Sequence, residues 1–252
     1  MNFHAARAIY IFLLATHWRF PMSFVSPLVS TTLYFIVFGA AMGTRVTAID
    51  GVSYGVFIIP GLIVMALLAD TIFTAAYTIL APKLSGTIYE ILSAPVSPLE
   101  IVLGHMGATA TKSTIVGLLT LAAARLFVDF DIMHPAHMII FLVLTSLTVS
   151  LLGLIVGIWA GEWHKLNTIM ALIVNPLAFL SGSFYSIGTL PPLWRGVALF
   201  DPVVYVVSGF RWSFFGISDV SVTASYCVTV ALLLLFFCTS WQMFRTGFKL
   251  RS

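Results

Sequence analysis

The stretch KLSGTIYEILSAPVSPLE, residues 83–100, separates two apolar runs of this chain, 53–80 and 101–125. Each run is long enough to cross a hydrocarbon core of about 30 Å, which takes roughly 20 residues of α-helix. The stretch itself carries one lysine, two glutamates and two prolines. We therefore expect it to lie in water beside the membrane, as the connection between two membrane-spanning helices.

The composition of the whole chain also points to a membrane as its solvent. Of 252 residues, 60% are hydrophobic and 8% are charged, and the mean hydropathy is +1.06. A soluble domain carries roughly 25% charged residues, so the sequence predicts an integral membrane protein surrounded by lipids, with no nucleic acid as a partner. The two cysteines, Cys227 and Cys238, both lie in the last apolar run, which argues against a disulfide framework or a thiolate zinc site.

Six apolar stretches are long enough to cross the bilayer as helices. They cover about residues 21–43, 53–80, 101–125, 136–160, 167–187 and 222–244. The apolar stretch before them, from Ala8 to Trp18, is too short to span, and we expect the segment 1–20 to lie in the membrane interface as a helix. No small-residue cleavage site follows its apolar stretch, so we expect no cleavable signal peptide. The predicted fold is an all-α integral membrane protein with six transmembrane helices and an N-terminal interfacial helix.

Six spans place both termini on the same side of the membrane, and the positive charges indicate which side that is. With the termini in the cytoplasm, the inner segments hold seven cationic residues and the outer segments hold four. The inner set is Arg7, Arg19, Lys83, Lys165, Arg245, Lys249 and Arg251, and the outer set is Arg45, Arg125, Arg195 and Arg211. Because cytoplasmic loops carry the excess of lysine and arginine, both termini are predicted to be cytoplasmic.

A short amphipathic helix is predicted within the cytoplasmic stretch. Leu84, Ile88, Ile91 and Leu92 recur at the spacing of one helix face, which predicts a helix over 84–94. This helix either rests on the membrane surface or offers its polar face to a cytoplasmic partner.

The signals that follow predict where this helix ends and the next one begins. Pro95 ends the short helix, because the residue before a proline avoids the α region. Ser97 is a suitable N-cap, Pro98 suits the first helical position, and Glu100 completes the pattern of a capping box.

Two charged residues fall inside predicted spans. Asp70 lies ten residues from Leu80 and Lys112 lies eleven residues from Ile101, so at 1.5 Å per residue both lie about 15–17 Å deep. A charge at this depth is unfavourable unless it is paired or hydrated. We predict an ion pair or a shared polar contact between Asp70 and Lys112; the alternative is that each faces a water-filled crevice of its own.

The fifth span contains residues that break helices. Asn175-Pro176 interrupts it, and glycines and prolines follow up to Pro192. Non-helical backbone at membrane depth is tolerated where it is buried in protein or lines a cavity. We therefore expect re-entrant half-helices on the outer side, between spans five and six. Asn175, Phe179, Phe184 and Tyr185 are predicted nearest an exit path; the alternative for these aromatic rings is simple packing.

Two stretches carry a family resemblance. GTIYEILSAPVSPLEIVLGH, from residue 86, resembles the cytoplasmic loop of the ABC-2 family of transporter permeases. NPLAFLSGSFYSIGTLPPLWRGVALFDPVVYVVSGFR, residues 175–211, resembles the second signature of that family. The match is greatest with small bacterial permeases, which include nodulation-factor and antibiotic exporters.

The resemblance implies one transmembrane domain over 1–252, in the cytoplasmic membrane of a bacterium. In that family two permease chains pair with two separate ATPase subunits, and the helix between spans two and three, the coupling helix, docks on the ATPase. The residues that match this helix are Gly86, Thr87, Ile88, Glu90, Leu92 and Pro95. The resemblance also implies an external gate over 188–212. A second cytoplasmic link, 160–167, is either a solvated turn or a further ATPase contact through Trp163 and His164.

Catalytic chemistry within this chain is not expected. The sequence holds no G-x-x-x-x-G-K-[ST] phosphate loop, so ATP and magnesium are expected on the partner subunit and no cofactor or metal on this chain. It also lacks H-E-x-x-H, and no histidine follows His164 to serve a serine protease. The acidic and histidine residues of DFDIMHPAH, 129–137, match no metal-ligand spacing.

Two functions remain open from the residues. The first is the permease subunit of an ATP-driven exporter, which would work as a homodimer with the pathway at the two-fold axis. The second is a stand-alone secondary transporter or channel driven by an ion gradient. The lack of repeated halves and the coupling-helix motif favour the first. An amphipathic lipid, a glycolipid or polysaccharide, or a hydrophobic drug would all suit the apolar interior as substrate.

Overall fold

The computed structural model describes residues 3–43, 48–49 and 51–250. Four residues used in the predictions lie outside these ranges: Arg45 and Arg251 from the charge count, and the first two residues of the predicted interfacial helix.

The described chain is helical apart from one pair of very short strands. The helices are α1 His4–Arg19, α2 Met22–Gly43, α3 Tyr54–Phe57, α4 Ile59–Ser85, α5 Ile88–Ser93, α6 Pro98–Arg125, α7 Pro135–Ala160, α8 Trp163–Ile169, a π-helical turn Met170–Val174, α9 Asn175–Leu180, a 3-10 turn Ile187–Thr189, α10 Pro192–Leu199, α11 Pro202–Phe215 and α12 Val222–Thr246. Strand β1, Ala48–Ile49, pairs antiparallel with β2, Val52–Ser53. This small hairpin is an addition to the all-α fold that we predicted.

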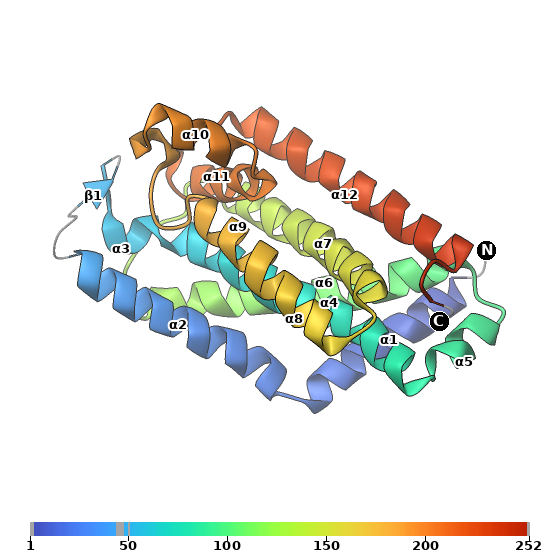
Figure 1. Cartoon of the computed structure of the whole chain (residues 1–252). Coiled ribbons are helices and arrows are strands. Elements are labelled where there is room, and N and C mark those ends of the chain that lie inside the picture. Colours follow the sequence, from blue (N-terminus) through green and yellow to red (C-terminus); the bar gives the residue numbers. More distant parts are fainter. Residues whose placement is uncertain (1–2, 44–47, 50, 251–252) are drawn as a thin grey trace.

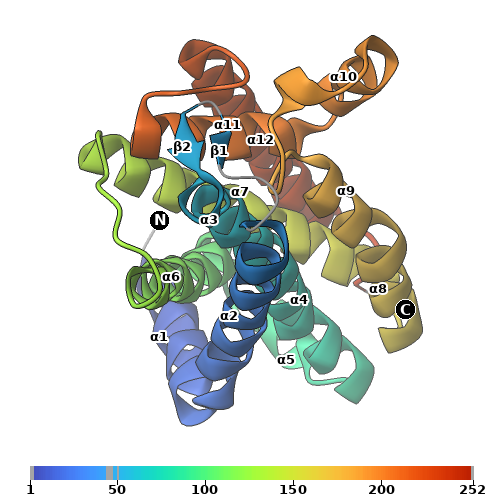
Figure 2. The same ribbon diagram turned by 90° about the vertical axis from the view of Figure 1, so that its left-hand side faces the viewer.

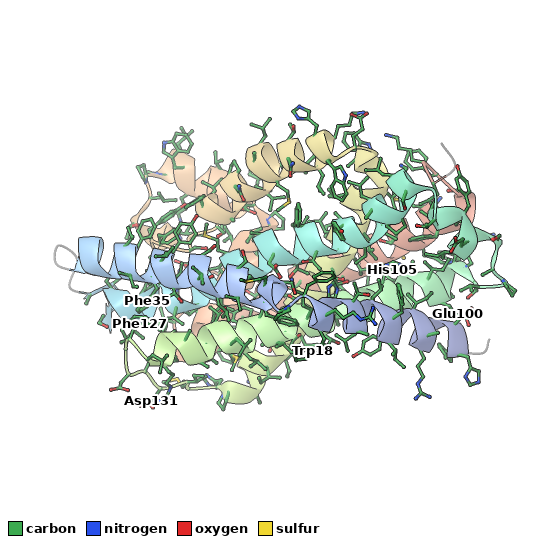
Figure 3. All side chains as sticks on the ribbon, turned by 90° about the horizontal axis from the view of Figure 1, so that it is seen from below. Trp18, Phe35, Glu100, His105, Phe127 and Asp131 are labelled. Atoms are coloured by element: carbon green, nitrogen blue, oxygen red, sulfur yellow. The ribbon has the colours of Figure 1, made fainter. Side chains whose placement is uncertain are left out.

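The helices form an elongated bundle with two distinct ends (Figure 1). Both ends of the chain lie at the end that carries α5, and β1, α3 and α10 lie at the other. Seen along the bundle, α4 and α7 lie in the middle, between α1, α2 and α6 below and α10, α11 and α12 above (Figure 2). The labelled side chains follow the same order: Glu100 lies at the α5 end, Trp18 in between, and Phe35, Phe127 and Asp131 at the opposite end (Figure 3).

Four helical segments of the described chain are long and apolar enough to cross a membrane. They are Met22–Gly39, Tyr54–Ser85, Pro135–Ala160 and Val222–Thr246, and the pair α10 and α11, bent by 93°, could supply a fifth. The protein is therefore a multi-pass helical membrane protein with four or five candidate spans, where the sequence predicted six. Helix α6 has the required length, but its polar residues, among them His105 and Lys112, lower its hydropathy.

Helix α1 is the predicted N-terminal helix. It packs lengthwise against the first half of α6, where Gly104 gives room for Ile9 and Gly107 for Tyr10. The hydroxyl groups of Tyr10 and Thr111 form a hydrogen bond of 3.1 Å. The placement of α1 in the membrane interface stays a prediction.

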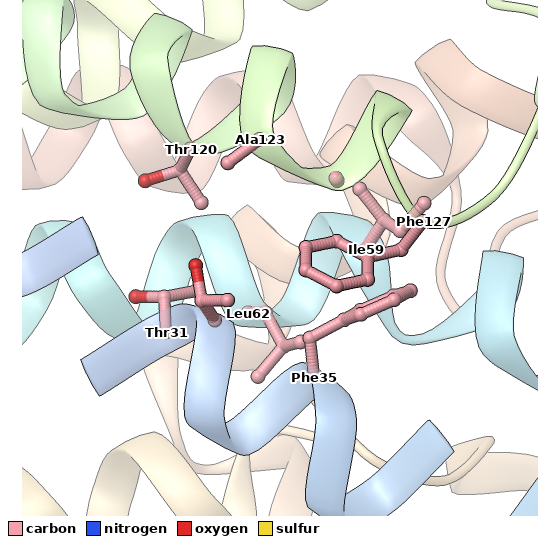
Figure 4. A pocket seen from close by; sticks show the side chains of 9 residues that line it. Thr31, Phe35, Ile59, Leu62, Thr120, Ala123 and Phe127 are labelled. Carbon is pink, nitrogen blue, oxygen red and sulfur yellow. The ribbon is translucent and has the colours of Figure 1, made fainter. Parts of the chain in front are cut away.

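At the end of the bundle opposite α5, which is predicted to face outward and which we call the outer end, α2 closes against α4 and α6. The rings of Phe35 and Phe127 lie 5.5 Å apart, and with Ile59 and Leu62 they leave a cavity of about 20 Å³ (Figure 4). That space is close to the minimum that one water molecule needs. The bundle is thus well packed at this point, and larger openings lie elsewhere along α4.

The central pair, α4 and α7, is held together by small residues. Gly153 and Gly157 form a G-x-x-x-G motif on α7 that lets two helix backbones approach closely. A Cβ atom on Gly157 would lie 2.6 Å from the carbonyl oxygen of Ala76, and one on Gly153 would lie 2.7 Å from that of Ile72.

Because the obstacle is backbone, Gly157→Ala should lower the free energy of unfolding by about 1–3 kcal/mol, as overpacking does. The measurement is thermal unfolding of the purified chain in detergent. The matched control is Gly196→Ala in α10, where an added Cβ meets nothing within 4 Å. Equal stability of the two variants would contradict the close helix contact.

Candidate functional site: a membrane groove beside an intramembrane ion pair

The cytoplasmic connection predicted from residues 83–100 begins later than expected. Helix α4 runs on to Ser85, so Leu84 belongs to α4, and the predicted start of the short helix at residue 84 is wrong. Gly86 ends α4 with φ +80, a left-handed conformation that glycine adopts freely. The short helix is α5, Ile88–Ser93.

Helix α5 has one buried face and one exposed face. Ile88 is 2% exposed and, with Ile91 and Leu92, it packs against Ile101 and other apolar residues at this end of the bundle. Four of the other residues assigned to the coupling helix are exposed: Gly86, Thr87, Glu90 and Pro95. An exposed polar face on a firmly packed helix can bind a partner at this end.

The exit from α5 follows the predicted pattern. The chain enters α6 through a capping box in which the Ser97 hydroxyl accepts from the Glu100 amide at 3.3 Å. The Glu100 carboxylate accepts from the Ser97 amide at 2.9 Å. This reciprocal pair fixes the start of α6 and so connects α5 rigidly to the bundle.

The ion pair predicted within the membrane is present. The Lys112 ammonium on α6 lies 2.8 Å from one Asp70 carboxylate oxygen and 2.9 Å from the other. It also donates to the Thr74 hydroxyl at 2.9 Å. Lys112 is 1% exposed and Asp70 is 16% exposed, so the lysine is enclosed while the carboxylate reaches a surface.

Further polar contacts continue along the same helix pair. Thr71 donates to Ser113 at 2.6 Å, and Thr78 and the Nδ1 atom of His105 lie 3.1 Å apart. With Asp70 and Thr74 they form a polar seam between α4 and α6. Interhelical hydrogen bonds of this kind hold membrane helices together.

Two open pockets meet at Asp70. The one toward α5, of about 730 Å³, lies between α1 and α4 and includes His17, Thr74 and Thr87. The other, of about 340 Å³, lies between α2, α4 and α9. Both are lined by Ser26, Asp70 and Phe73, so together they form one groove, which we call the α4 groove.

The α4 groove is long enough to cross a bilayer. Along α4 its lining runs from Leu62 to Ser85, which at 1.5 Å per residue is about 35 Å against a hydrocarbon core of about 30 Å. Its wall combines hydroxyl groups, a carboxylate and aromatic rings, so it can accept a molecule with both polar and apolar parts.

The predicted break at Asn175-Pro176 is a π-helical turn instead of an interruption. The turn Met170–Val174 leads directly into α9 with Asn175 in helical geometry. A π turn widens the helix just before Pro176, which relieves the clash of the proline ring with an earlier carbonyl. The helical path therefore continues to Leu180.

The four residues predicted along an exit path do not all share one place. Asn175 and Phe179 line the α4 groove. Phe184 stacks on Phe179 with ring centroids 5.7 Å apart, and its ring centroid lies 4.2 Å from that of Phe38 in a tilted arrangement. The hydroxyl of Tyr185 donates to the Leu180 carbonyl at 2.8 Å, so this side chain serves the loop structure.

At the outer end, sequence reasoning missed a buried ion pair. Arg211 of α11, 1% exposed, pairs with Asp219, 6% exposed, and also donates to the Gly182 carbonyl at 2.6 Å. The Asp219 carboxylate accepts from the Ser186 hydroxyl at 2.8 Å and the Ile187 amide at 2.9 Å. This network, the outer network, ties the bent pair of α10 and α11 to the loop that follows α9. The only sequence signal for this ion pair was that Arg211 and Asp219 carry opposite charges eight residues apart.

The second cytoplasmic link presents exposed side chains. Trp163 and His164 are both exposed, and the ring of Trp163 lies 5.4 Å from that of Tyr77, which lines the α4 groove. Lys165 and Glu162 form an exposed ion pair of 2.8 Å. The hydrogen bond from Lys165 lowers the pKa of Glu162. This exposure fits both roles considered for the link, a solvated turn and a further contact with the ATPase.

The outer segment 129–137 is arranged by ring stacking. His134 lies 4.4 Å from the ring of Trp212, and His137 meets the same ring edge-on at 5.1 Å. Over the part of the chain that the structure describes, no group of three or more histidine, cysteine or acidic residues could hold a metal ion.

Long apolar helices around an open groove with a central ion pair define a multi-pass membrane protein of the transport class. Residues 6–215 match the model of the ABC-2 type transporter family. The chain belongs to this family, as a membrane permease domain, and membership implies an ATPase partner.

Proteins with related sequences support the assignment. The inner membrane transport permease YadH of Escherichia coli K12 is 36% identical over 228 residues, which is 90% of this chain and 89% of YadH. Nodulation protein J of Rhizobium leguminosarum bv. viciae is 23% identical over 215 residues, 85% and 82% of the two chains. Nodulation protein J of Rhizobium meliloti is 27% identical over 192 residues, 75% and 72%.

Proposed function

We propose that the chain is the permease subunit of an ATP-driven exporter in a bacterial inner membrane, with both termini in the cytoplasm. YadH is named as an inner membrane transport permease, and the two chain ends share one end of the bundle. The six spans of this proposal are α2, α3 with α4, α6, α7, α8 with α9, and α12, within one domain over 1–252. The bent pair α10 and α11 is then a re-entrant element in the external gate region 188–212.

The α4 groove is the observation that carries this proposal. It extends beside α4 from the α5 end toward the outer end, and it is open along one side instead of enclosed. A second copy of the chain could close that side, and a closed two-fold arrangement is the commonest form of oligomer. Exposed apolar residues beside the groove, among them Leu33 and Tyr34 on α2 and Leu172 in the π-helical turn before α9, supply a surface for such contact.

In this proposal α5 is the coupling helix. Its polar face, with Glu90 at its centre, contacts one of two ATPase subunits, which bind ATP and magnesium. The capping box at Ser97 and the buried Ile88 would transmit a push on α5 to α6, because both join it to the bundle without a flexible linker. Trp163 and His164 are a second contact to the same subunit.

The lining of the α4 groove favours an amphipathic substrate. The rings of Phe73, Tyr77 and Phe179 and the hydroxyl groups of Ser26 and Thr74 lie along one path. A lipid, a glycolipid or lipid-linked polysaccharide, or a hydrophobic drug has the polar and apolar parts that this path can accept.

Charge reversal on α5 tests the ATPase contact. Purified from its native membrane, the wild-type chain should carry an ATP-hydrolysing subunit in equal amount, and Glu90→Arg should lose most of it. The control is Asp129→Arg, which makes the same change at an exposed site at the opposite end and should keep the subunit. A chain that purifies without any ATPase and transports solute in liposomes down an ion gradient would overturn the proposal in favour of a secondary transporter.

A further inference from the structure

A second groove lies on another face of α4 and differs from the first in being almost wholly apolar. It has a volume of about 400 Å³ and is bounded by α4, α7, the continuous helix of α8 and α9, α11 and α12. Val64, Leu68 and Ile72 of α4 form its floor, and Leu177 and Phe236 lie on its sides. The volume is in the range of small-molecule sites. We call it the apolar groove.

The apolar groove runs lengthwise from the α5 end of the bundle. Its lining on α7 extends from Trp159 back to Thr145, which at 1.5 Å per residue is about 21 Å. One leaflet of a bilayer is about 15 Å of hydrocarbon deep, half of the core. An acyl chain that enters beside Trp159 can therefore lie in the groove along its whole length.

Two lysines lie together at the mouth of this groove. Lys249 donates to the carbonyl of Trp159 at 3.4 Å, and its ammonium lies 4.6 Å from the centre of the Trp159 ring. Lys83 donates to the neighbouring carbonyl, that of Ile158, at 3.2 Å. Lys249 and Lys83 thus come within reach of one small anion.

Neither lysine has an acidic partner among the described residues. The ion pairs in the described ranges 3–43, 48–49 and 51–250 join Lys112 to Asp70, Lys165 to Glu162 and Arg211 to Asp219. Two adjacent ammonium groups repel each other, and an anion between them removes this repulsion. Among the residues that the structure describes, no acidic side chain therefore balances the positive charge at the mouth of the apolar groove.

We propose that the apolar groove binds an anionic phospholipid, with one acyl chain along α7 and the phosphate between Lys83 and Lys249. The charge at the mouth and the apolar path behind it match the two parts of such a lipid. Basic pockets between membrane helices bind acidic head groups, and tryptophan favours the same interfacial depth. A free phosphate ion would leave the apolar path unused. The site is distinct from the α4 groove and does not depend on the proposed ATPase contact.

The proposal is tested by native mass spectrometry of the full chain in detergent, titrated with phosphatidylglycerol or phosphatidylcholine. The wild-type chain should retain one phosphatidylglycerol and bind it more tightly than phosphatidylcholine. In Lys83→Ala/Lys249→Ala, the affinity for phosphatidylglycerol should fall about 25-fold, from about fivefold for each lysine, toward that for phosphatidylcholine. Lys165→Ala removes the same charge from a lysine already paired with Glu162 and should bind as the wild type.

Filling the groove provides an independent test. Leu152→Trp places a large ring among the lining residues and should weaken both lipids about equally, with the chain eluting unchanged in size-exclusion chromatography. The matched control, Leu126→Trp, lies outside the groove at a side chain that is 84% exposed and should bind as the wild type. Unchanged phosphatidylglycerol binding in the double lysine variant, or equal displacement of the lipid by glycerol phosphate, would overturn the proposal.

Discussion

Asp70→Ala should lower the free energy of unfolding by about 3–5 kcal/mol, as expected when a buried charge loses its partner. Lys112 is 1% exposed, and without Asp70 it would keep only the Thr74 hydroxyl among its present polar contacts. Lys112→Ala should be less damaging, because the remaining carboxylate is 16% exposed and borders the α4 groove. The measurement is thermal unfolding of each purified variant in detergent.

The double variant Asp70→Ala/Lys112→Ala separates a true pair from two independent polar residues. It should be more stable than Asp70→Ala alone, because no orphaned charge remains. Thr71→Ala/Ser113→Ala is the control, since it removes a neutral contact of 2.6 Å on the same two helices. If the double charge variant were as unstable as the sum of the two single ones, the pair would contribute no coupling.

The intramembrane pair could be predicted from the sequence because membrane depth is a strong restraint. Two opposite charges at matching depth on consecutive antiparallel helices have few alternatives to meeting. The start of α6 was equally accessible, since a capping box involves only Ser97 and Glu100, three residues apart. In both cases the relevant physics lies within one helix or between neighbouring helices.

Local backbone conformations and contacts between distant segments explain what the sequence did not reveal. The end of α4 depends on Gly86 adopting a left-handed conformation, and an apolar spacing that includes Leu84 cannot show that the helix has already stopped. The π turn before Pro176 is one of several ways in which a helix can accommodate a proline. The motif of Gly153 and Gly157 is visible in the sequence, but its partner, the backbone of α4 at Ala76, becomes known only from the fold.

The number of spans likewise depends on contacts between helices, which an average hydropathy does not include. The polar residues that keep α6 out of the set of apolar spans are largely those that face α4: His105, Lys112 and Ser113. A helix that is polar on one buried face and apolar elsewhere can still lie in a bilayer when a neighbour satisfies its polar groups. The average hydropathy of α6 is therefore lower than that of a typical span although the helix can still cross the membrane. For this reason we count α6 among the six proposed spans.

Asp219→Ala should be the most damaging single change at the outer end, with a loss of about 3–5 kcal/mol in the free energy of unfolding. It leaves the guanidinium of Arg211 buried against the Phe57 ring, whose centre lies 4.1 Å away. It also removes the acceptor of the Ser186 hydroxyl and the Ile187 amide. The measurement is again thermal unfolding in detergent, beside Asp131→Ala, an exposed acidic residue at the same end that should change little.

The outer network lies at the opposite end of the bundle from α5, and this separates its two possible effects. If Asp219→Ala loosens only the outer end, the purified variant should keep its ATPase partner as the wild type does and should lose transport. Ile187 packs with Ala198 of α10 and Val204 of α11, so loss of its amide contact should free the bent pair first. A variant as stable as Asp131→Ala would show that Arg211 has found another partner, and the outer network would then have no structural role of its own.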